Sequence, residues 1–522
     1  MMMRMCAWKR SQLLFVLAVL SMLAMLWESS WQSQFPLLNK SELFNFQVYK
    51  PLFSLVRNTS GLVKLVLVSA FFDARPALFD RLPQVTVVLL NRFEENDVLD
   101  SPSSRCLLQD AQGRIVRVPF VLKRSPEHWK LIFRVVFVHC LIDPKEISLE
   151  EFTPHSVALE LAEAPPVFIE VSWTQEMVSL LHARNYRNES SFWKRWISRD
   201  DSTLESEFPL NQWAPESWSI CTAPLRTGKT DVFLPQFLEY YKSMGSSQVK
   251  VYLESSSESL DEILARYSDF VEIIPWNLPP CALVLNDSEL SICSTSRGYV
   301  HYFAQSAAIN DCMLRASGQS RWVLFVDFDE FLSPQGTLDS TLTETFSLLL
   351  DQVQAAGVEP AELWGFHFFS YLYSRCNHSA WTRSLGISEQ EEDSFMAFLS
   401  QYRQPKTPGV GIRSKCLVAP ILIDEMRVHT PGTSLSPLSS STALIQLNDW
   451  IYTWKDANCI IRKKMFIELF KAKLVFVYPE RAHIHHVRHK TRRECRNHVF
   501  VGNSSVLTGH PLEFIQRLQA KT

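Results

Sequence analysis

The stretch WVLFVDFDEFLSP, residues 322–334, passes directly from an apolar run into a group of acidic residues. The run WVLFV has the length and the Val-rich, aromatic composition of a buried β-strand. Asp327, Asp329 and Glu330 follow it within four positions. Carboxylates this close repel one another unless a cation neutralises them. The stretch therefore predicts a strand whose carboxyl end holds a metal ion, and the alternative is a solvated turn after the strand.

Strand-like and helix-like segments alternate from residue 213 onward. Strands are predicted in SWSICTAPL, QVKVYLES and FVEIIPW, and helices in FLPQFLEYYKSMG, SLDEILARYSD and HYFAQSAAINDCMLRASG. Gly245 is expected to close the first of these helices. This alternation predicts an α/β domain with a doubly wound, mostly parallel sheet over 213–515, and such sheets bind ligands at the carboxyl ends of their strands.

Residues 61–205 show a different pattern, in which short runs rich in Val, Ile and Phe are separated by Pro, Gly and Asp. The pattern predicts a smaller, β-rich domain that is antiparallel and sandwich-like. With 522 residues, 46% of them hydrophobic, the chain is long enough for two or three cored domains. Its net charge of −3 argues against nucleic acid as the main partner.

The N-terminus predicts a membrane anchor. Three basic residues within positions 1–10 precede an uncharged apolar segment at 11–27. At about 1.5 Å per residue it is slightly short for a ~30 Å hydrocarbon core, but early secretory membranes are thinner. We favour a signal-anchor over a cleaved signal peptide, because no small-x-small cleavage site follows. The preceding positive charge predicts a cytosolic tail at 1–10, a stem at 28–60 and a lumenal body, as in a single-pass type II protein.

Glycosylation signals and cysteines agree with a lumenal body. Six Asn-x-Ser/Thr acceptors are present, at Asn39, Asn58, Asn188, Asn286, Asn377 and Asn503. Ten of the eleven cysteines follow the predicted span, and their irregular spacing without CxxC pairs argues against zinc. An oxidising compartment would allow up to five disulfides, and the alternative for any single cysteine is a buried free thiol.

The segment FAQSAAINDCMLRASGQSRWVLFVDFDEFL resembles the core signature of glycosyltransferase family 92. LVSAFFDAR and ICTAPL, with the residues that follow them, are similar to further parts of the family, so the resemblance spans about residues 62–490. It implies a GT-A fold and a metal-dependent, inverting transfer of a sugar from a uridine diphosphate donor to a glycan on glycoproteins or glycolipids. The sugar is galactose in characterised members. Mn²⁺ or Mg²⁺ and UDP-galactose are therefore the expected cofactor and donor.

The resemblance also assigns roles to single residues. Asp327 and Asp329 would hold the metal and the donor diphosphate. Gln305 and Asp311 would lie near the nucleotide or support its loop. A hard divalent ion takes few carboxylates and completes its shell with water and phosphate oxygens, which agrees with this assignment.

Residues later in the chain are candidates for the same site. His429 and His486 are the two candidates for a third metal ligand, and either could instead be a structural histidine. Arg488 would compensate the charge of the leaving diphosphate. Two positions depart from the family pattern: Ala419 replaces an Arg, and Val487 replaces a Tyr. These departures bear on donor or acceptor choice.

An inverting transfer needs a general base, and aromatic side chains could stack on sugars. The segment 388–395 offers acidic residues at Glu389, Glu391, Glu392 and Asp393. A solvated acidic loop is the alternative. Trp364 and Trp381 are candidates for sugar stacking, although aromatic residues near strands are more often in the core.

These observations predict a Golgi membrane enzyme whose catalytic domain is lumenal. The alternative from another class is a catalytically silent lumenal glycan-binding protein with the same fold, and Ala419 keeps that alternative open. A third interpretation is a phosphotransferase that would release a nucleoside monophosphate. The sequence identifies neither the acceptor nor the oligomeric state, so a homo-oligomer stays open.

Overall fold

The structure is a computed structural model that describes residues 53–75, 81–93, 98–127, 129, 131–149, 151–162, 164–173, 217–225, 234–286, 288–291, 298–334, 341–355, 363–374, 402–403, 414–434, 474–477, 482–488 and 501–502. All of them belong to one compact unit, Pro51–Thr522. The predicted anchor at 11–27 lies outside the described residues. Within the described part of the chain, no helix has the length and hydropathy that a membrane span requires.

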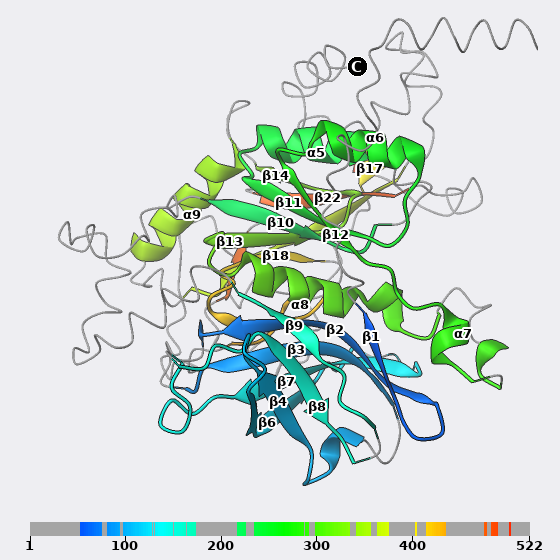
Figure 1. Ribbon diagram of the computed structural model, residues 1–522. Coiled ribbons are helices and arrows are strands. Elements are labelled where there is room, and N and C mark those ends of the chain that lie inside the picture. Colours follow the sequence, from blue (N-terminus) through cyan, green and yellow to red (C-terminus); the bar gives the residue numbers. More distant parts are fainter. Residues whose placement is uncertain are drawn as a thin grey trace, which may run out of the picture. The chain divides into compact units, whose positions relative to one another are not determined.

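The first part of the chain forms one nine-stranded sheet (Figure 1). Its strands are β1 (Ser54–Arg57), β2 (Val63–Asp73), β3 (Gln84–Arg92), β4 (Arg105–Gln109), β5 (Ile115–Val118), β6 (Phe120–Arg124), β7 (Phe133–Leu141), β8 (Ser156–Glu160) and β9 (Ile169–Ser172). Their order is β5-β4-β8-β9-β2-β3-β7-β6, with β1 paired to β2. All pairs are antiparallel except β2 with β9. The β-rich prediction is confirmed, and β1 begins within the predicted stem.

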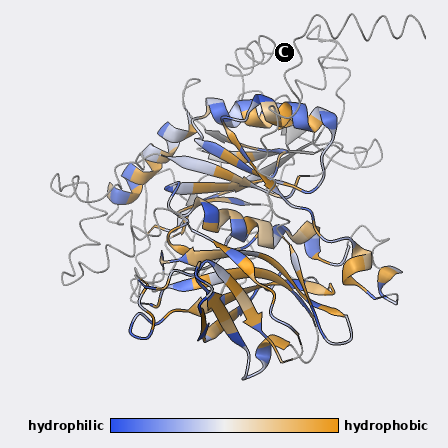
Figure 2. Cartoon of the chain, viewed as in Figure 1, coloured by the Kyte–Doolittle hydropathy of each residue, from blue (hydrophilic) through white to orange (hydrophobic). Residues whose placement is uncertain are grey.

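This sheet folds back on itself. Cys106 on β4 and Cys140 on β7 form a disulfide with a Cα–Cα distance of 5.8 Å. The two strands are five steps apart in the sheet, which would separate them by roughly 24 Å if it were flat. Curling therefore encloses a core of Val, Leu and Phe side chains, and the hydrophobic colour of these strands is visible in Figure 2.

The second part contains a seven-stranded sheet and two smaller ones. The seven strands are β10 (Trp218–Thr222), β11 (Gln248–Leu253), β12 (Val271–Pro275), β13 (Trp322–Val326), β15 (Gly365–Phe368), β18 (Lys415–Val418) and β21 (Leu474–Val477). Their order is β12-β11-β10-β13-β18-β15-β21. Four of the six pairs are parallel. The order reverses between β10 and β13, so the carboxyl ends of these two strands flank a topological switch point.

The remaining strands form a five-stranded and a two-stranded sheet. The first, in the order β14-β22-β16-β17-β23, consists of β14 (Glu330–Pro334), β16 (Ser370–Ser374), β17 (Tyr402–Arg403), β22 (Ala482–Arg488) and β23 (Val501–Gly502). The second pairs β19 (Ile423–Met426) with β20 (Pro431–Ser434). β14 begins at Glu330, immediately after the acidic turn, so this sheet borders the end of β13.

Helices cover both faces of the seven-stranded sheet, as doubly wound α/β folds require (Figure 1). The described helices of this part are α5 (Leu234–Ser243), α6 (Glu258–Arg266), α7 (Cys281–Val284), η6 (His301–Ala304), α8 (Gln305–Ala316) and α9 (Leu342–Ala355), and η2 (Val98–Asp100) belongs to the first part of the chain. Gly245 follows α5 with φ of 92°, as expected for a glycine that ends a helix. The mixed α/β prediction is therefore confirmed, with most strand pairs of the seven-stranded sheet parallel.

One predicted helix starts later than the sequence indicates. The pattern predicts a helix from His301, but α8 begins at Gln305. Tyr302, Phe303 and Ala304 have positive φ angles of 41°, 56° and 60° and form a left-handed turn instead. Trp276 holds this turn, because its Nε1 donates to the Phe303 carbonyl at 2.8 Å.

Helix α8 lies between the two large sheets, contacting β10 and β13 on one side and β2 and β3 on the other. Polar links reinforce this junction. Arg75, paired with Asp73, donates from Nη1 to the carbonyls of Pro420 (2.6 Å) and Ile423 (2.8 Å). Lys123 forms an ion pair of 2.5 Å with Asp424. The nine-stranded sheet thereby fixes the segment that follows β18.

The cysteines correct one expectation. Cys221 on β10 and Cys312 on α8 form a second disulfide, and Cys281 is also disulfide-bonded. Cys416, in contrast, is a buried free thiol. Burial raises its pKa, and its Sγ lies 3.3 Å from the His429 carbonyl. Five disulfides among the ten cysteines are therefore excluded, and the alternative of a free buried thiol holds for Cys416.

Candidate active site

The acidic turn follows β13 at the switch point. The Asp327 amide donates to Glu330 Oε2 at 2.8 Å, and the Glu330 amide donates to the Asp327 carbonyl at 3.0 Å. Between them Phe328 is buried against Phe237, with ring centroids 5.1 Å apart. On either side of the buried Phe328, Asp327 and Asp329 are partly exposed. Two carboxylates therefore reach solvent at the carboxyl end of the strand.

A buried lysine lies beneath these carboxylates. Lys415, the first residue of β18, places Nζ 2.8 Å from Asp327 Oδ2 and 2.9 Å from Glu330 Oε2. Its side chain and that of Glu330 are almost fully buried. Burial alone would lower the pKa of Lys415, but the two carboxylates outweigh it and raise that pKa. The ammonium group is therefore charged and fixes Asp327 and Glu330 in place.

Lys415 contacts two of the three carboxylates of the turn, those of Asp327 and Glu330. In the described residues, no three His, Cys, Asp or Glu side chains converge to hold a metal by themselves. A hard divalent cation that takes two carboxylates and completes its shell with water and phosphate oxygens fits this donor set.

The start of α8 contacts the same turn. Gln305 is buried, and its Nε2 donates to Asp327 Oδ1 at 3.4 Å. This contact agrees with a supporting position for Gln305 beside the acidic turn. Asp327 thus has one carboxylate oxygen toward Lys415 and the other toward Gln305.

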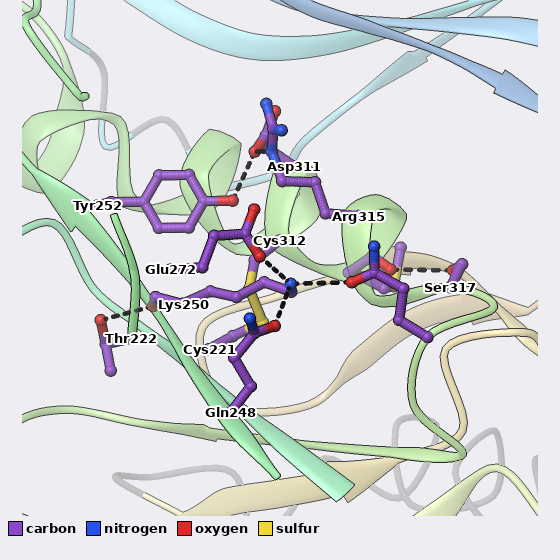
Figure 3. Close-up of a disulfide and its surroundings, with 12 residues drawn as sticks. Cys221, Thr222, Gln248, Lys250, Tyr252, Glu272, Asp311, Cys312, Arg315 and Ser317 are labelled. Atoms are coloured by element: carbon purple, nitrogen blue, oxygen red, sulfur yellow. Dashed lines mark hydrogen bonds and ion pairs between the residues drawn. A yellow bond between two sulfur atoms is a disulfide. The ribbon is translucent and has the colours of Figure 1, made fainter. Parts of the chain in front are cut away.

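Asp311 belongs to a buried cluster with Tyr252 and Arg315 (Figure 3). It is fully buried on α8, and its Oδ2 accepts from the Tyr252 hydroxyl at 2.5 Å and from Arg315 Nε at 2.7 Å. Burial, reinforced by the Asp311 charge, raises the pKa of Tyr252. Both partners are protein side chains, and the assignment of Asp311 to the nucleotide or its loop stays a prediction.

Two tyrosines of α5 hold the strand that follows the turn. The Tyr241 hydroxyl donates to the Glu330 carbonyl and accepts from the Leu332 amide, both at 3.0 Å. The Tyr240 hydroxyl donates to the Leu332 carbonyl at 2.6 Å. Burial raises the pKa of both phenols, so they stay neutral donors. β14 is consequently fixed at its first residues, and the acidic turn with it.

The two candidate histidines come from different segments: His429 lies between β19 and β20, and His486 lies on β22. His429 is half-buried, and its Nδ1 lies 3.0 Å from the Ser414 carbonyl, next to Lys415. His486 stands opposite Glu330 in the β14–β22 ladder. Arg488 ends β22, opposite Ser374. The side chains of His486 and Arg488 lie outside the described residues, so their assignments stay predictions.

Of the remaining predicted residues, the structure describes Ala419 and Trp364. Ala419 is buried, and its amide donates to the Trp364 carbonyl at 2.9 Å. Trp364 is only 6% exposed, so its ring is in the core, and the expectation of sugar stacking there is wrong. Trp381 and the candidate bases Glu389, Glu391, Glu392 and Asp393 lie outside the described residues.

Two of the six glycosylation acceptors are described. Asn58 is half-exposed and Asn286 is exposed. In each, the side-chain carbonyl accepts from the hydroxyl of the serine two residues later, at 2.8 Å for Ser60 and 2.6 Å for Ser288. Both asparagines are accessible to modification. Asn39, Asn188, Asn377 and Asn503 lie outside the described residues.

The comparison with known families agrees with this geometry. The model of glycosyltransferase family 92 matches residues 216–520, more than half of the chain. The chain belongs to glycosyltransferase family 92. The match includes the seven-stranded sheet, the acidic turn and Lys415 of this family 92 chain, whereas the nine-stranded sheet precedes it. No curated protein matches the chain.

Proposed function

We propose that this family 92 chain is a metal-dependent, inverting galactosyltransferase that transfers galactose from UDP-galactose to a glycan on glycoproteins or glycolipids. The observation that carries the proposal is the pair of partly exposed carboxylates, Asp327 and Asp329, at the switch point above the buried Lys415. Two neighbouring, partly exposed carboxylates fit a divalent cation bound together with a diphosphate. The proposed fold of this part is GT-A.

Asp327 and Asp329 would hold Mn²⁺ or Mg²⁺. When bound, the ion would stabilise the negative charge that develops on the departing diphosphate. Lys415 and Gln305 keep the Asp327 carboxylate oriented before any ligand arrives, which is the preorganisation that electrostatic catalysis requires. The acids at 388–395 are the proposed source of the general base, and Arg488 of further positive charge.

The proposed location is the Golgi membrane, with a single span at 11–27 and a lumenal catalytic domain. The disulfide pairs Cys106–Cys140 and Cys221–Cys312 support an oxidising compartment. Protease treatment of sealed microsomes tests the orientation. If protease removes most of the mass without detergent, the proposed topology is wrong.

Uridine diphosphate binding tests the activity most directly. Full-length protein in detergent is titrated with uridine diphosphate, with and without Mn²⁺, and we expect binding that strengthens with the metal. Release of the diphosphate is then compared for UDP-galactose, UDP-glucose and UDP-N-acetylglucosamine in the presence of glycan acceptors. Absence of binding in both conditions would contradict the proposal and favour the catalytically silent glycan-binding protein, for which the buried Ala419 in place of the family's Arg is the supporting observation.

A further inference from the structure

Two exposed aromatic side chains, one from each part of the chain, are held together by a histidine. Trp129, between β6 and β7, is 69% exposed, and Tyr302, in the turn before α8, is 66% exposed. His301 joins them. Its ring stacks on Trp129, with centroids 5.1 Å apart and an interplanar angle of 14°, and contacts Tyr302 edge-on at 4.3 Å. We call Trp129, His301 and Tyr302 the aromatic platform.

The backbone of the platform is strained. Among the described residues, those other than glycine with positive φ are Trp129, Tyr302, Phe303 and Ala304. A left-handed conformation costs roughly 1–2 kcal/mol per residue for residues that carry a Cβ. Such strain persists where the surrounding structure enforces it, and it concentrates at functional sites. Here the enforcing contacts are the Trp276 hydrogen bond to Phe303 and the burial of Ala304.

Trp129 and the neighbouring residues His301 and Tyr302 are each linked to the first turn of α8. Gln305, which touches Asp327, follows the left-handed turn directly. Ser306 donates to Glu127 Oε2 at 3.0 Å, and Glu127 lies two residues before Trp129. His301 precedes Gln305 by four residues. The platform is therefore connected to the residue that contacts the acidic turn by a short stretch of chain and by the Ser306–Glu127 hydrogen bond.

The chemistry of the platform fits a neutral sugar ring. Burial lowers the pKa of His301 to about 4, so its imidazole is uncharged at neutral pH and stacks as a neutral ring. A rigid Trp face with a Tyr edge offers large contact area at low entropic cost. Trp129 comes from the connection β6–β7, outside the parallel strands β10–β13 whose carboxyl ends form the switch point. This origin favours the acceptor over the nucleotide of the donor.

We propose that the aromatic platform is the acceptor subsite, where a neutral hexose ring of the glycan stacks on Trp129 beside Tyr302. The inference rests on the proposed transferase function, because it assumes that a glycan must be held next to the acidic turn. It assigns acceptor recognition partly to the nine-stranded sheet, which the family match does not include.

The test compares substitutions on and away from the platform in the full-length protein. Trp129→Ala and Tyr302→Ala are measured with UDP-galactose and a panel of p-nitrophenyl β-hexosides, and the same variants are tested for binding to immobilised neutral N-glycans. We expect the acceptor KM or the glycan Kd to rise about tenfold for Trp129→Ala, and less for Tyr302→Ala. Trp129→Phe should recover much of the loss.

Donor binding and a matched surface change serve as controls. The KM for UDP-galactose and the Mn²⁺-dependent binding of uridine diphosphate should stay unchanged in the platform variants. Ile115→Ala removes a 51% exposed apolar side chain at the edge strand β5 and should alter neither acceptor nor donor binding. If Trp129→Ala fails to fold, Trp129→Phe and Tyr302→Ala decide the question.

Three outcomes would overturn the inference. Unchanged acceptor binding in both alanine variants would show that the platform has no role in recognition. A rise in the donor KM instead would assign the rings to the uracil base. No glycan binding by the wild type would also contradict it. In contrast, glycan binding that is lost in Trp129→Ala, in a protein that never binds uridine diphosphate, would support the platform while the proposed transfer fails.

Discussion

Two buried lysines in the seven-stranded sheet differ in what surrounds them. Lys250 on β11 pairs across the ladder with Glu272 on β12 and also donates to Gln248 and Gln319 (Figure 3). Burial is the larger effect there and lowers the pKa of Lys250. Lys415 on β18 faces two carboxylates, and they raise its pKa. Both lysines are buried, but their surroundings disfavour the charged form of Lys250 and favour the charged form of Lys415.

The difference separates a structural cluster from the candidate site. At Lys250 one carboxylate and two amide oxygens meet one ammonium group, so protein groups supply its partners. At Lys415 two carboxylates meet one ammonium group, and one of them, Asp327, is partly exposed close to Asp329. Carboxylates this close repel one another, and a bound cation relieves that repulsion. The partly exposed carboxylates beside the lysine, more than the burial of the lysine, distinguish the candidate site.

The largest expected effect is that of Lys415→Met. It leaves Glu330 buried and next to Asp327 without a counter-charge, so we expect a loss of about 3–5 kcal/mol in the free energy of unfolding. Sugar transfer should also fall, because Asp327 loses its orientation. Chemical denaturation and diphosphate release measure the two losses. Adding Glu330→Gln should recover part of the stability, and an unaffected single variant would show that the ion pairs do not form.

Asp329→Asn should separate activity from stability. Removing one charge relieves repulsion in the empty site, so the melting temperature should change little. Transfer should fall at least about a hundredfold, by analogy with losing one preorganised stabilising group, and excess Mn²⁺ should restore it only partly. Glu258→Gln, on the exposed first turn of α6, is the matched control. Near-normal turnover in Asp329→Asn would show that Asp329 is not a metal ligand. A failure to fold would show that Asp329 has a structural role in the turn.

Lys250→Met should affect stability alone, and more weakly than Lys415→Met. Its partner Glu272 is 31% exposed and can be hydrated when the lysine is gone, so we expect a loss of at most about 2 kcal/mol. Transfer should stay within about twofold of the wild type. A large loss of turnover with normal melting would mean that the cluster in Figure 3 takes part in the reaction.

The smallest effect should appear in alkaline solution, with opposite signs for the two lysines. The pKa of Lys250 is lowered in the folded protein, so the unfolded chain binds more protons as the pH approaches 10.5. The contribution of Lys250 to the free energy of unfolding therefore rises with pH. The folded pKa of Lys415 is raised, so its contribution is constant below 10.5 and is lost above it. The difference in unfolding free energy between wild type and each Met variant, followed from pH 8 upward, measures both trends. Parallel curves would contradict the comparison.

Local pattern and distant pairing explain what the sequence could and could not predict. The strand WVLFV and the acidic residues at its carboxyl end follow from a local pattern, and the contact of Gln305 with Asp327 agrees with the place that the family resemblance gives Gln305. Lys415 is missed, because its contact with Asp327 spans 88 residues and depends on the antiparallel pairing of β13 with β18. Its place at the start of the apolar run KCLV is a signal that could have indicated a buried lysine.

The aromatic platform shows a different limit. HYFA contains no glycine, so nothing in the sequence indicates a left-handed turn, and the apolar pattern predicts a helix from His301. Tertiary contacts from Trp276 override that local preference. The missing partner ring, Trp129, lies in the connection between β6 and β7, 172 residues before His301, so its stacking on His301 could not be predicted from spacing.

The links made by Arg75 and Lys123 have a consequence for how this chain can change in evolution. These cations come from strands β2 and β6 and their ends, yet they bind carbonyls and carboxylates of the segment just after β18. A gene fusion that kept residues 216–520 and replaced the preceding part would remove Lys123, the ion-pair partner of Asp424. The two halves should therefore be inherited together, and recombination between relatives should be tolerated only where both sides of these links are exchanged at once.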